Sequence, residues 1–408
     1  MTSNVSQNHA APTTSASPAA SHALTRRDKP VRIGIDVMGG DHAPDAIIKG
    51  CALALEDLHP GDCLVLVGPE KMIREILAER GISPSDPRIE VVDATEVIQM
   101  GETPSKAVRS KVNSSIVKLH AMGAEGHPNR CDVVLSAGNT GACVAAAMLH
   151  MRRLPGVIRP GIAVTIPLFH GPLILIDAGA NPEPKPEHLA QYGIMADELA
   201  KDVLKIAKPR VALMNIGAEE EKGTDMIKEA RDLLRAAPGM NYIGFIEGRD
   251  FFEGAADVVV TDGLVGNTLL KAAEGMARAM MKAIVGEILA YDPMLALQFE
   301  PIVKALYKKN DYHEYGGAPL LGVNGACMIA HGSSEPRTIR AAIRNSRTFV
   351  QSGVNEAIVR RLAESGSARA AAAINSAANT AALVPNNLAS DPTSPAAPTI
   401  RSQEIARP

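Results

Sequence analysis

Two similar segments of the sequence each combine a short apolar strand, a glycine-rich turn and the start of a helix. In the first, Asp132–Ser136 precedes the turn Gly138–Gly141 and an apolar run. In the second, Asp257–Thr261 precedes the turn Asp262–Asn267 and another apolar run. Such a turn directs backbone N–H groups and the positive end of a helix dipole at one point, which favours anions and phosphate in particular. The pair of segments predicts a site for phosphate, or for an oxyanion beside it.

Further apolar runs alternate with helical stretches along the chain, mostly without a polar–apolar alternation. This pattern is typical of strands buried on both faces and predicts an α/β fold with a largely parallel sheet. Because ligands bind at the carboxyl ends of such strands, we expect the glycine-rich turns to share one cleft. The predicted strands are Val31–Val37, Cys63–Gly68, Arg88–Asp93, Asp132–Ser136, Gly161–Pro167, Leu173–Asp177, Val211–Ile216, Tyr242–Glu247 and Asp257–Thr261.

Composition excludes several classes of function. The net charge is −3 and only 3% of residues are aromatic, with no Trp, which argues against a nucleic-acid partner. Five cysteines without a C-x-x-C pair argue against a disulfide framework and a structural zinc site, and fit the cytosol. We find no cluster with the spacing of metal ligands and expect no cofactor. No apolar run is long enough to span a membrane.

The organisation predicted is one folded domain between two low-complexity ends. Residues 1–30 are rich in Ala, Ser, Thr and Pro and predict a disordered extension, and residues 365–408 predict a similar tail. The folded part covers residues 31–360. Within it, Lys271–Lys309 predicts a helical hairpin broken near Pro293, with Met294, Leu295, Leu297 and Phe299 at its apolar tip. The tip is interpreted as a membrane-surface or acyl-chain contact, or as a core or dimer helix pair.

Several other turns place reactive side chains at predicted strand ends, each with a structural alternative. Asp36, Gly39, Gly40 and His42 follow the first strand, although a tight turn with a capping Asp41 explains them equally well. Asp177, Asn181 and Lys185 follow another strand, on a loop stiffened by alternate prolines. Asn215 follows a further strand, where the structural alternative is a plain turn, since Asn and Gly are typical turn residues. Cys143 is a conceivable nucleophile but is more often a small buried residue.

Eight such motifs in order resemble those of bacterial phosphate acyltransferases. They are Asp36-x-x-Gly-Gly-Asp41, Ser136-Ala-Gly-Asn-Thr-Gly-Ala142, Asp177-x-Gly-Ala-Asn181, Asn215-Ile-Gly-x-Glu219, Gly244-Phe-Ile-Glu-Gly248, Asp262-Gly-x-x-Gly-Asn267, Glu314-Tyr-Gly-Gly-Ala318 and Ala330-His-Gly-Ser-Ser334. The resemblance covers about residues 31–360. It implies a three-layer α/β/α sandwich like that of phosphotransacetylases, and a homodimer.

The resemblance also implies a reaction. Inorganic phosphate attacks the thioester of a long-chain fatty acyl carrier protein, without a covalent enzyme intermediate. The acyl phosphate then passes to a membrane glycerol-3-phosphate acyltransferase, so the enzyme is expected in the cytoplasm, associated peripherally with the inner face of the membrane. The catalytic candidates are Lys185, His42, Asn181 and Asn215. The candidate ligands of phosphate or thioester are Asp36, Gly39, Gly40, Ser136, Gly138, Asn139, Thr140, Gly141, Asp177, Asp262, Gly266, Asn267 and His331.

Two other functions remain open at this point. An acyl-CoA phosphotransacetylase would use the same phosphate site with a short acyl chain. A non-catalytic membrane-associated adaptor would explain the helical hairpin but not the many strand-end glycine turns. A dehydrogenase is disfavoured because residues 36–41 lack the G-x-G-x-x-G spacing.

Overall fold

The computed structural model describes residues 29–83, 85–309 and 315–366. The predicted N-terminal extension and C-terminal tail therefore lie almost wholly outside the described residues. The described strands are β1 Arg32–Asp36, β2 Cys63–Gly68, β3 Ile89–Asp93, β4 Val133–Ser136, β5 Gly161–Leu168, β6 Gly171–Ile176, β7 Val211–Met214, β8 Tyr242–Ile246, β9 Val258–Val260, β10 Ala318–Leu321 and β11 Ala326–Ile329.

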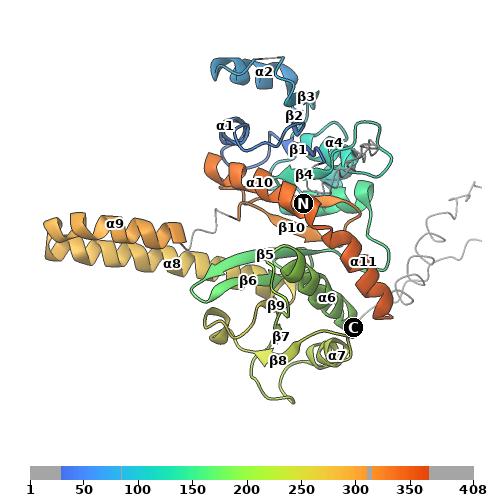
Figure 1. The fold of residues 1–408 in the computed structure, drawn as a ribbon, viewed down its shortest axis with the longest axis vertical. Helices are drawn as coiled ribbons and strands as arrows, with labels where there is room; N and C mark the ends of the chain where they lie inside the picture. The colour runs from blue at the N-terminus through green and yellow to red at the C-terminus, as the bar shows by residue number, and fades with distance from the viewer. Residues whose placement is uncertain (1–28, 84, 310–314, 367–408) are drawn as a thin grey trace, which may run out of the picture.

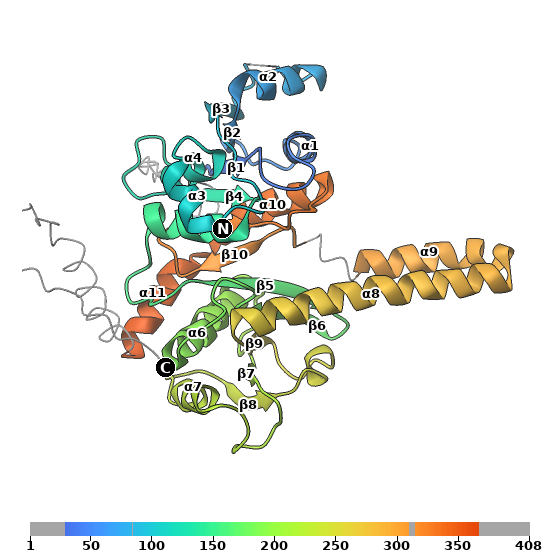
Figure 2. The same ribbon diagram turned by 180° about the vertical axis from the view of Figure 1, so that it is seen from behind.

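The helices cover the strands on both sides (Figures 1 and 2). They are α1 Asp45–Ala54, α2 Glu70–Glu79, α3 Pro104–Ser110, α4 Ser115–Met122, α5 Thr140–Ala146, α6 Pro186–Asp202, α7 Asp225–Arg235, α8 Gly263–Tyr291, α9 Pro293–Lys309, α10 Pro336–Ser352 and α11 Val354–Glu364. A π-helical turn, η2 Ala147–Met151, continues α5, and η3 Asp250–Phe252 is a short 3₁₀ turn. The α/β sandwich that the sequence predicts is confirmed.

All described strands belong to one mixed sheet, in the order β3-β2-β1-β4-β11-β10-β5-β6-β9-β7-β8. The strands from β3 to β11 are mutually parallel, and so are those from β6 to β8. Between these two groups, β11 to β10, β10 to β5 and β5 to β6 are three antiparallel steps. Three reversals leave the two parallel groups running in opposite directions.

This polarity corrects the expectation that every glycine-rich turn lies at one edge of the sheet. The turns after β1, β4 and β11 lie at one edge, whereas the turns after β6, β9, β7 and β8 lie at the other. The cause is the connection from β5 to β6, which consists of Phe169 and His170 alone. Two residues permit only a hairpin, so β6 must run antiparallel to β5.

The strands are buried on both faces, which explains their continuous apolar character. In β2, Leu64 and Leu66 pack into the core beneath α1, α6 and α10, while Val65 and Val67 pack into the core beneath α4 and α5. All four side chains are 0% exposed. Burying each of them contributes on the order of 1.5–3 kcal/mol, which fixes the sheet from which the turns extend.

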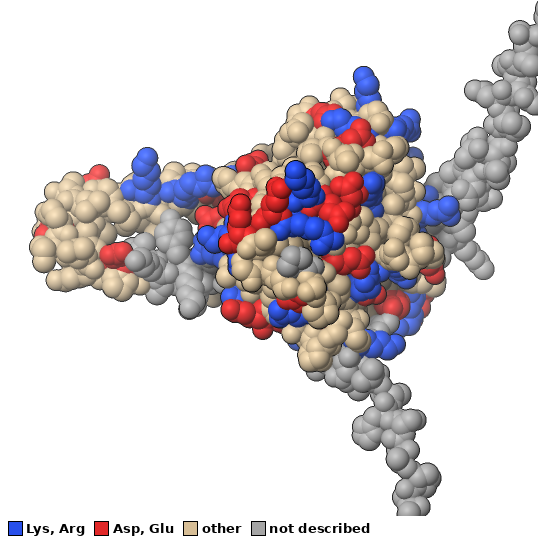
Figure 3. All heavy atoms as spheres, turned by 90° about the horizontal axis from the view of Figure 1, so that it is seen from above, with Lys and Arg blue, Asp and Glu red and all other residues tan. Residues whose placement is uncertain are grey.

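Helices α8 and α9 form the predicted hairpin, which projects beyond the sandwich (Figures 1 and 2). The break at Asp292 is confirmed, but α8 begins at Gly263 rather than near Lys271, because Asp262 caps it there. Large apolar side chains are exposed along the projection, among them Met276 at 62% and Met294 at 64%. Seen from above, its far end carries few charged side chains (Figure 3). Among the described residues, none of the helices combines the length and apolarity needed to cross a membrane.

Candidate active site

The turns after β1, β4 and β11 meet at one edge of the sheet and form the first turn cluster, residues 36–41, 136–141 and 331–334. The backbone of Asp41 donates to the carbonyl of Gly332 over 2.7 Å, and that of Ala330 donates to the carbonyl of Ser136 over 2.9 Å. A side chain on Gly39 would lie 2.6 Å from the nitrogen of Gly138. Glycine is therefore required at position 39 by the neighbouring turn itself.

Asp36 and Ser136 hold this cluster together from inside. The Ser136 hydroxyl donates to Oδ2 of Asp36 over 2.7 Å and accepts from the backbone of Gly138 over 3.0 Å. The backbone of Met38 donates to Oδ1 of Asp36. Both side chains are at most 2% exposed, and burial raises the pKa of Asp36. We therefore interpret Asp36 and Ser136 as residues that shape the turns, and not as residues that a substrate contacts.

The turn before α5 is similarly bound into the fold. Asn139 is buried: its Oδ1 caps α5 by accepting from Ala142, and its Nδ2 donates to three carbonyls of the loop at residues 99–102. A side chain on Gly141 would lie 2.6 Å from Cγ of Pro104. The packing of α3 therefore already demands glycine at position 141. Thr140 and Gly141 remain partly exposed and are the parts of this turn open to a ligand.

The second turn cluster, Asp177–Asn181 and Thr261–Asn267, lies at the opposite edge. Oδ1 of the buried Asp177 accepts from the backbones of Ile162 and Ala180, and Oδ2 accepts from that of Asn181 over 2.6 Å. Burial raises the pKa of Asp177. The Nδ2 of Asn181 donates to the carbonyl of Pro160 and to the hydroxyl of Tyr192. These side chains are therefore engaged within the protein.

In the same cluster, Asp262 and Gly266 have structural roles at the start of α8. Oδ1 of Asp262 accepts from the backbone of Val265 over 2.8 Å, as a helix cap does. A side chain on Gly266 would overlap the carbonyl oxygen of Asp177. Asn267 is exposed and lies beside Gly179, where a ligand can reach it.

Helix α8 connects the two clusters. Its first turn binds the second cluster, because the backbone of Gly263 donates to the carbonyl of Asn181 over 2.8 Å. Two turns later, Nζ of Lys271 lies 2.5 Å from Nε2 of His331 in the first cluster. Lys271 is not among the candidates that the sequence motifs provide. One sequence feature could have indicated Lys271: it lies four residues after Asn267, on the same face of the predicted helix.

Three of the predicted residues make none of the contacts described above within the two turn clusters. His42 is exposed on the turn after β1. Lys185 is exposed where α6 begins, and its backbone donates to Nδ1 of His188 over 3.0 Å. Asn215 follows β7, two strands from β6, and its Nδ2 donates to the carbonyls of Gly217 and Lys222.

The thiol of Cys143 is poorly suited to nucleophilic catalysis. It is 0% exposed beneath the first cluster, and burial raises its pKa to about 12. A thiol with this pKa is almost entirely protonated at neutral pH, so it supplies little thiolate. The structure thus favours the interpretation of Cys143 as a small buried residue.

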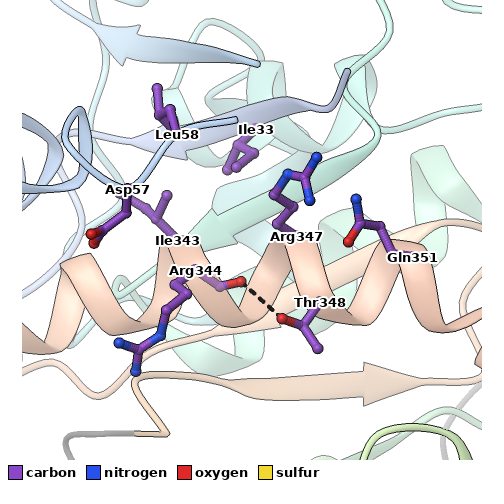
Figure 4. A pocket seen from close by; sticks show the side chains of 8 residues that line it. All are labelled: Ile33, Asp57, Leu58, Ile343, Arg344, Arg347, Thr348 and Gln351. Atoms are coloured by element: carbon purple, nitrogen blue, oxygen red, sulfur yellow. Dashed lines mark hydrogen bonds between the residues drawn. The ribbon is translucent and has the colours of Figure 1, made fainter. Parts of the chain in front are cut away.

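A cavity of about 200 Å³ lies away from both clusters, between α10 and the segment after α1 (Figure 4). Its wall includes Arg344, Arg347, Asp57 and Ile33. Nε of Arg347 is bound to the buried carboxylate of Asp62 over 2.8 Å. Because Ile33 is at the start of β1 and the first cluster follows its end, this cavity is no part of the candidate site.

The fold and the paired turn clusters define the class of the protein. A phosphotransacetylase from Streptococcus pyogenes superposes with a TM-score of 0.53 at 15% identity, covering 79% of this chain and 94% of that one. At this level of identity, the likeness concerns the fold: the chain has a phosphotransacetylase-like α/β architecture.

Sequence comparison then gives the family. Residues 31–357 match the family model described as fatty acid synthesis protein. The phosphate acyltransferase of Desulfitobacterium hafniense is 44% identical over 335 residues, 81% of this chain and 98% of that protein. That of Heliobacterium modesticaldum is 44% identical over 80% of this chain and 96% of its own length. The chain belongs to this fatty acid synthesis family of acyltransferases.

Proposed function

We propose that the protein transfers a long-chain fatty acyl group from acyl carrier protein to inorganic phosphate, forming an acyl phosphate for phospholipid synthesis. The observation that carries the proposal is the meeting of three glycine-rich turns at one sheet edge, in a chain whose relatives are phosphate acyltransferases. The partly exposed start of α5 at Thr140 is the proposed place for the phosphate or the thioester oxyanion.

The proposed chemistry is direct attack. A phosphate oxygen forms a bond to the thioester carbonyl carbon, a tetrahedral oxyanion forms, and the carbon–sulfur bond breaks to release the carrier thiolate, which takes up a proton. Phosphate is a nucleophile at neutral pH and a thiolate leaves readily, so positioning and charge stabilisation are what the enzyme supplies. The buried, protonated Cys143 supports a reaction without an acyl-cysteine.

Lys185 and His42 are proposed to neutralise charge or move a proton, since both are exposed beside their turns. The motifs alone suggest that Asn181 and Asn215 orient oxygens of the substrate. Because their amide nitrogens donate to groups of the protein, we propose instead that they hold their turns in place.

The proposed partners follow from the product. An acyl phosphate is lipid-like and prone to hydrolysis, so release beside a membrane glycerol-3-phosphate acyltransferase avoids loss. The projecting hairpin offers exposed Met294, Leu297 and Phe299 to the inner face of the membrane, or to a second copy of the chain in a homodimer. The protein is accordingly proposed to be cytoplasmic and peripherally bound to the membrane.

The test is an assay of acyl phosphate, trapped with hydroxylamine, from purified protein, inorganic phosphate and either long-chain acyl carrier protein or acetyl-CoA. We expect product from the carrier-bound substrate and little from acetyl-CoA. Preference for acetyl-CoA would favour a phosphotransacetylase instead. Absence of product from both donors, with intact liposome binding, would favour an adaptor.

A further inference from the structure

Helix α3 carries two basic side chains without a partner inside the protein. Lys106 and Arg109 are exposed and lie about one helical turn apart, on the same side of α3. Neither makes an ion pair or a side-chain hydrogen bond with any residue that the structure describes. Together with Ser105 and Ser110, they line a shallow surface hollow of about 370 Å³. This helix face is therefore available to an anionic partner.

The segment around α3 is positively charged in a chain whose net charge is −3. Residues 103–124 include four Lys or Arg and no Asp or Glu. Two of the four are bound within the protein: Nζ of Lys111 donates to Oε1 of Glu102 over 2.6 Å, and Nζ of Lys118 donates to the carbonyl of Asp93 over 2.8 Å. Because Lys111 already neutralises Glu102, that carboxylate does little to offset the two unpaired cations of α3.

The packing of α3 directs the two unpaired cations outward. Ala107 and Val108, on the inner side of the helix, are 3% exposed and belong to the core beneath α4 and α5. Helix α3 therefore lies on the same face of the sheet as α4 and α5 (Figure 2). With the inner side held in the core, Lys106 and Arg109 are fixed on the solvent side.

Helix α3 also lies beside the candidate site. It packs against α5, whose first residue, Thr140, is the proposed place for the phosphate or the oxyanion. The loop before α3 is bound to the same turn, because Nδ2 of Asn139 donates to the carbonyls of Met100 and Glu102 over 3.0 and 3.2 Å. A partner seated on α3 would therefore be next to the first turn cluster.

Apolar side chains flank the basic helix face. Met100, before α3, is 52% exposed, and Val112, after it, is 59% exposed. A small anion in so shallow a hollow keeps most of its water and is screened by salt, so it gains little there. A protein can cover the cations and the apolar side chains together, as protein interfaces do.

The position of α3 favours a soluble protein over a membrane. The projecting end of the α8–α9 hairpin extends to the opposite side of the molecule from α3 (Figure 2). A membrane in contact with the hairpin tip would leave α3 facing away from the lipid.

We propose that the α3 surface, formed by Met100, Ser105, Lys106, Arg109, Ser110 and Val112, is the docking site for an acidic face of the acyl carrier protein. The inference rests on the proposed function and deepens it, because it says where the acyl donor is held. A carrier protein delivers its thioester on a flexible prosthetic arm, so its body must bind at the mouth of the site. Acidic side chains of the carrier meet Lys106 and Arg109, and the arm extends towards Thr140.

The first test measures binding of acyl carrier protein without its acyl group, so that no turnover is required. Lys106→Glu with Arg109→Glu should weaken binding by about tenfold or more, because it sets like charges against the partner. Lys106→Arg with Arg109→Lys keeps both charges and should keep the affinity. An unchanged affinity in the charge-reversed variant, with a native circular dichroism spectrum, would overturn the docking site.

A matched control separates a local effect from a change in overall charge. Lys205→Glu with Lys208→Glu reverses two exposed lysines of the same spacing, in the loop between α6 and β7. The control variant should bind the carrier protein as the wild-type protein does. Raising the salt concentration should weaken binding in the wild-type protein and in this control, and much less in the α3 variant. Equal losses of affinity in the two charge-reversed variants would overturn a local docking site.

Three further measurements test other occupants of the α3 surface. Phosphopantetheine alone should bind equally well to the wild-type protein and to the charge-reversed α3 variant. A loss for phosphopantetheine as large as the loss for the whole carrier would place the phosphate of the arm on α3 and overturn protein docking. Loss of sedimentation with anionic liposomes at unchanged carrier affinity would assign the surface to a membrane. A lower mass in light scattering at unchanged carrier affinity would assign it to a second copy of the chain.

Kinetics separate this inference from the proposed function. If the enzyme forms acyl phosphate, the charge-reversed α3 variant should show a raised KM for acyl carrier protein, with smaller changes in kcat and in KM for phosphate. If acyl phosphate forms with an unchanged KM for the carrier, the function stands and the docking site fails. If the wild-type protein binds the carrier through Lys106 and Arg109 but forms no acyl phosphate, the proposed function fails and the docking site stands.

Discussion

At the scale of single residues, the two turn clusters separate residues that shape a turn from residues that face solvent. Asp36 is the last residue of β1 and Asp177 directly follows β6, and both are buried and accept hydrogen bonds from the loop after the strand. A sequence motif contains both kinds of residue without distinguishing them. Lys185, Asn267 and His331, by contrast, are exposed to solvent.

Replacement of Cys143 by alanine should keep most of the activity, because direct attack by phosphate needs no thiolate. The measurement is the turnover of long-chain fatty acyl carrier protein by Cys143→Ala. Cys51→Ala, which removes another buried thiol, is the matched control. An acyl group found on Cys143 by mass spectrometry in the wild-type enzyme would refute direct attack.

Lys185→Ala should lower kcat/KM by about tenfold or more if its ammonium stabilises phosphate or the oxyanion. Its exposed position at the start of α6 argues against loss of folding as the cause of any effect. Lys71→Ala, on the outer helix α2, controls for the loss of one exposed positive charge. Equal kcat/KM in the two variants would remove Lys185 from the reaction.

The buried His120 makes stability depend on acid. Burial lowers its pKa to about 4, and its Nδ1 lies 2.7 Å from the carbonyl oxygen of Ile116. Below a pH of about 6.5, the unfolded chain takes up a proton that the folded protein refuses, so the free energy of unfolding falls as pH drops towards about 4. The full loss from this group is about 3 kcal/mol.

Denaturant unfolding at several pH values checks this expectation. His120→Gln should flatten the dependence between pH 6.5 and 4, whereas His59→Gln, an exposed histidine, should leave it as in the wild-type protein. An unchanged slope in His120→Gln would show that other groups cause the acid sensitivity.

At the scale of elements, most strands could be predicted from sequence but the polarity of the sheet was missed. Long runs such as Val31–Val37 stand out because both faces of the strand are apolar. The four-residue strands β10 and β11 were missed because glycines before and between them indicate turns. The reversal was readable: five residues between Pro167 and Leu173 are too few for a crossover helix, and so require antiparallel strands.

The start of α8 offers a test of whether Asp262 caps the helix or binds substrate. Asp262→Asn keeps a capping oxygen and should preserve both melting temperature and activity, whereas Asp262→Ala should cost about 1 kcal/mol of stability. Thr224→Ala, which removes the cap of α7, is the comparison for a capping loss outside the two clusters. Loss of activity in Asp262→Asn at unchanged stability would indicate a substrate contact.

At the scale of the whole molecule, the hairpin of α8 and α9 exposes apolar side chains at its tip and along its shaft. The tip carries Met294 and Leu297, and the shaft of α8 carries Met276 and Met280, all more than half exposed. Burying a side chain of this size is worth about 1.5–3 kcal/mol, so a few of them give reversible binding to a membrane or a second copy.

Two double variants test which partner each of these surfaces contacts. Met294→Glu with Leu297→Glu should abolish sedimentation with anionic liposomes and leave the activity on soluble acyl carrier protein largely intact. Met276→Glu with Met280→Glu, a change of the same size, should instead disrupt the proposed homodimer, which light scattering would detect as a lower mass than that of the wild-type protein. If the tip variant still sediments with liposomes, the tip is not the membrane contact, and if it becomes a monomer, the hairpin is a dimer helix pair.

Helix α8 connects the two turn clusters, and this connection restricts where residues can be inserted or deleted in the chain. Each residue inserted into a helix turns the remainder of that helix by about 100° and advances it by about 1.5 Å. One insertion between Asn267 and Lys271 would carry the lysine off the face that meets His331, however similar the new residue was. Beyond Glu274, where the helix leaves the body of the protein, added or deleted turns only lengthen or shorten the projection. Natural length differences should therefore gather in the outer hairpin and spare the first three turns of α8.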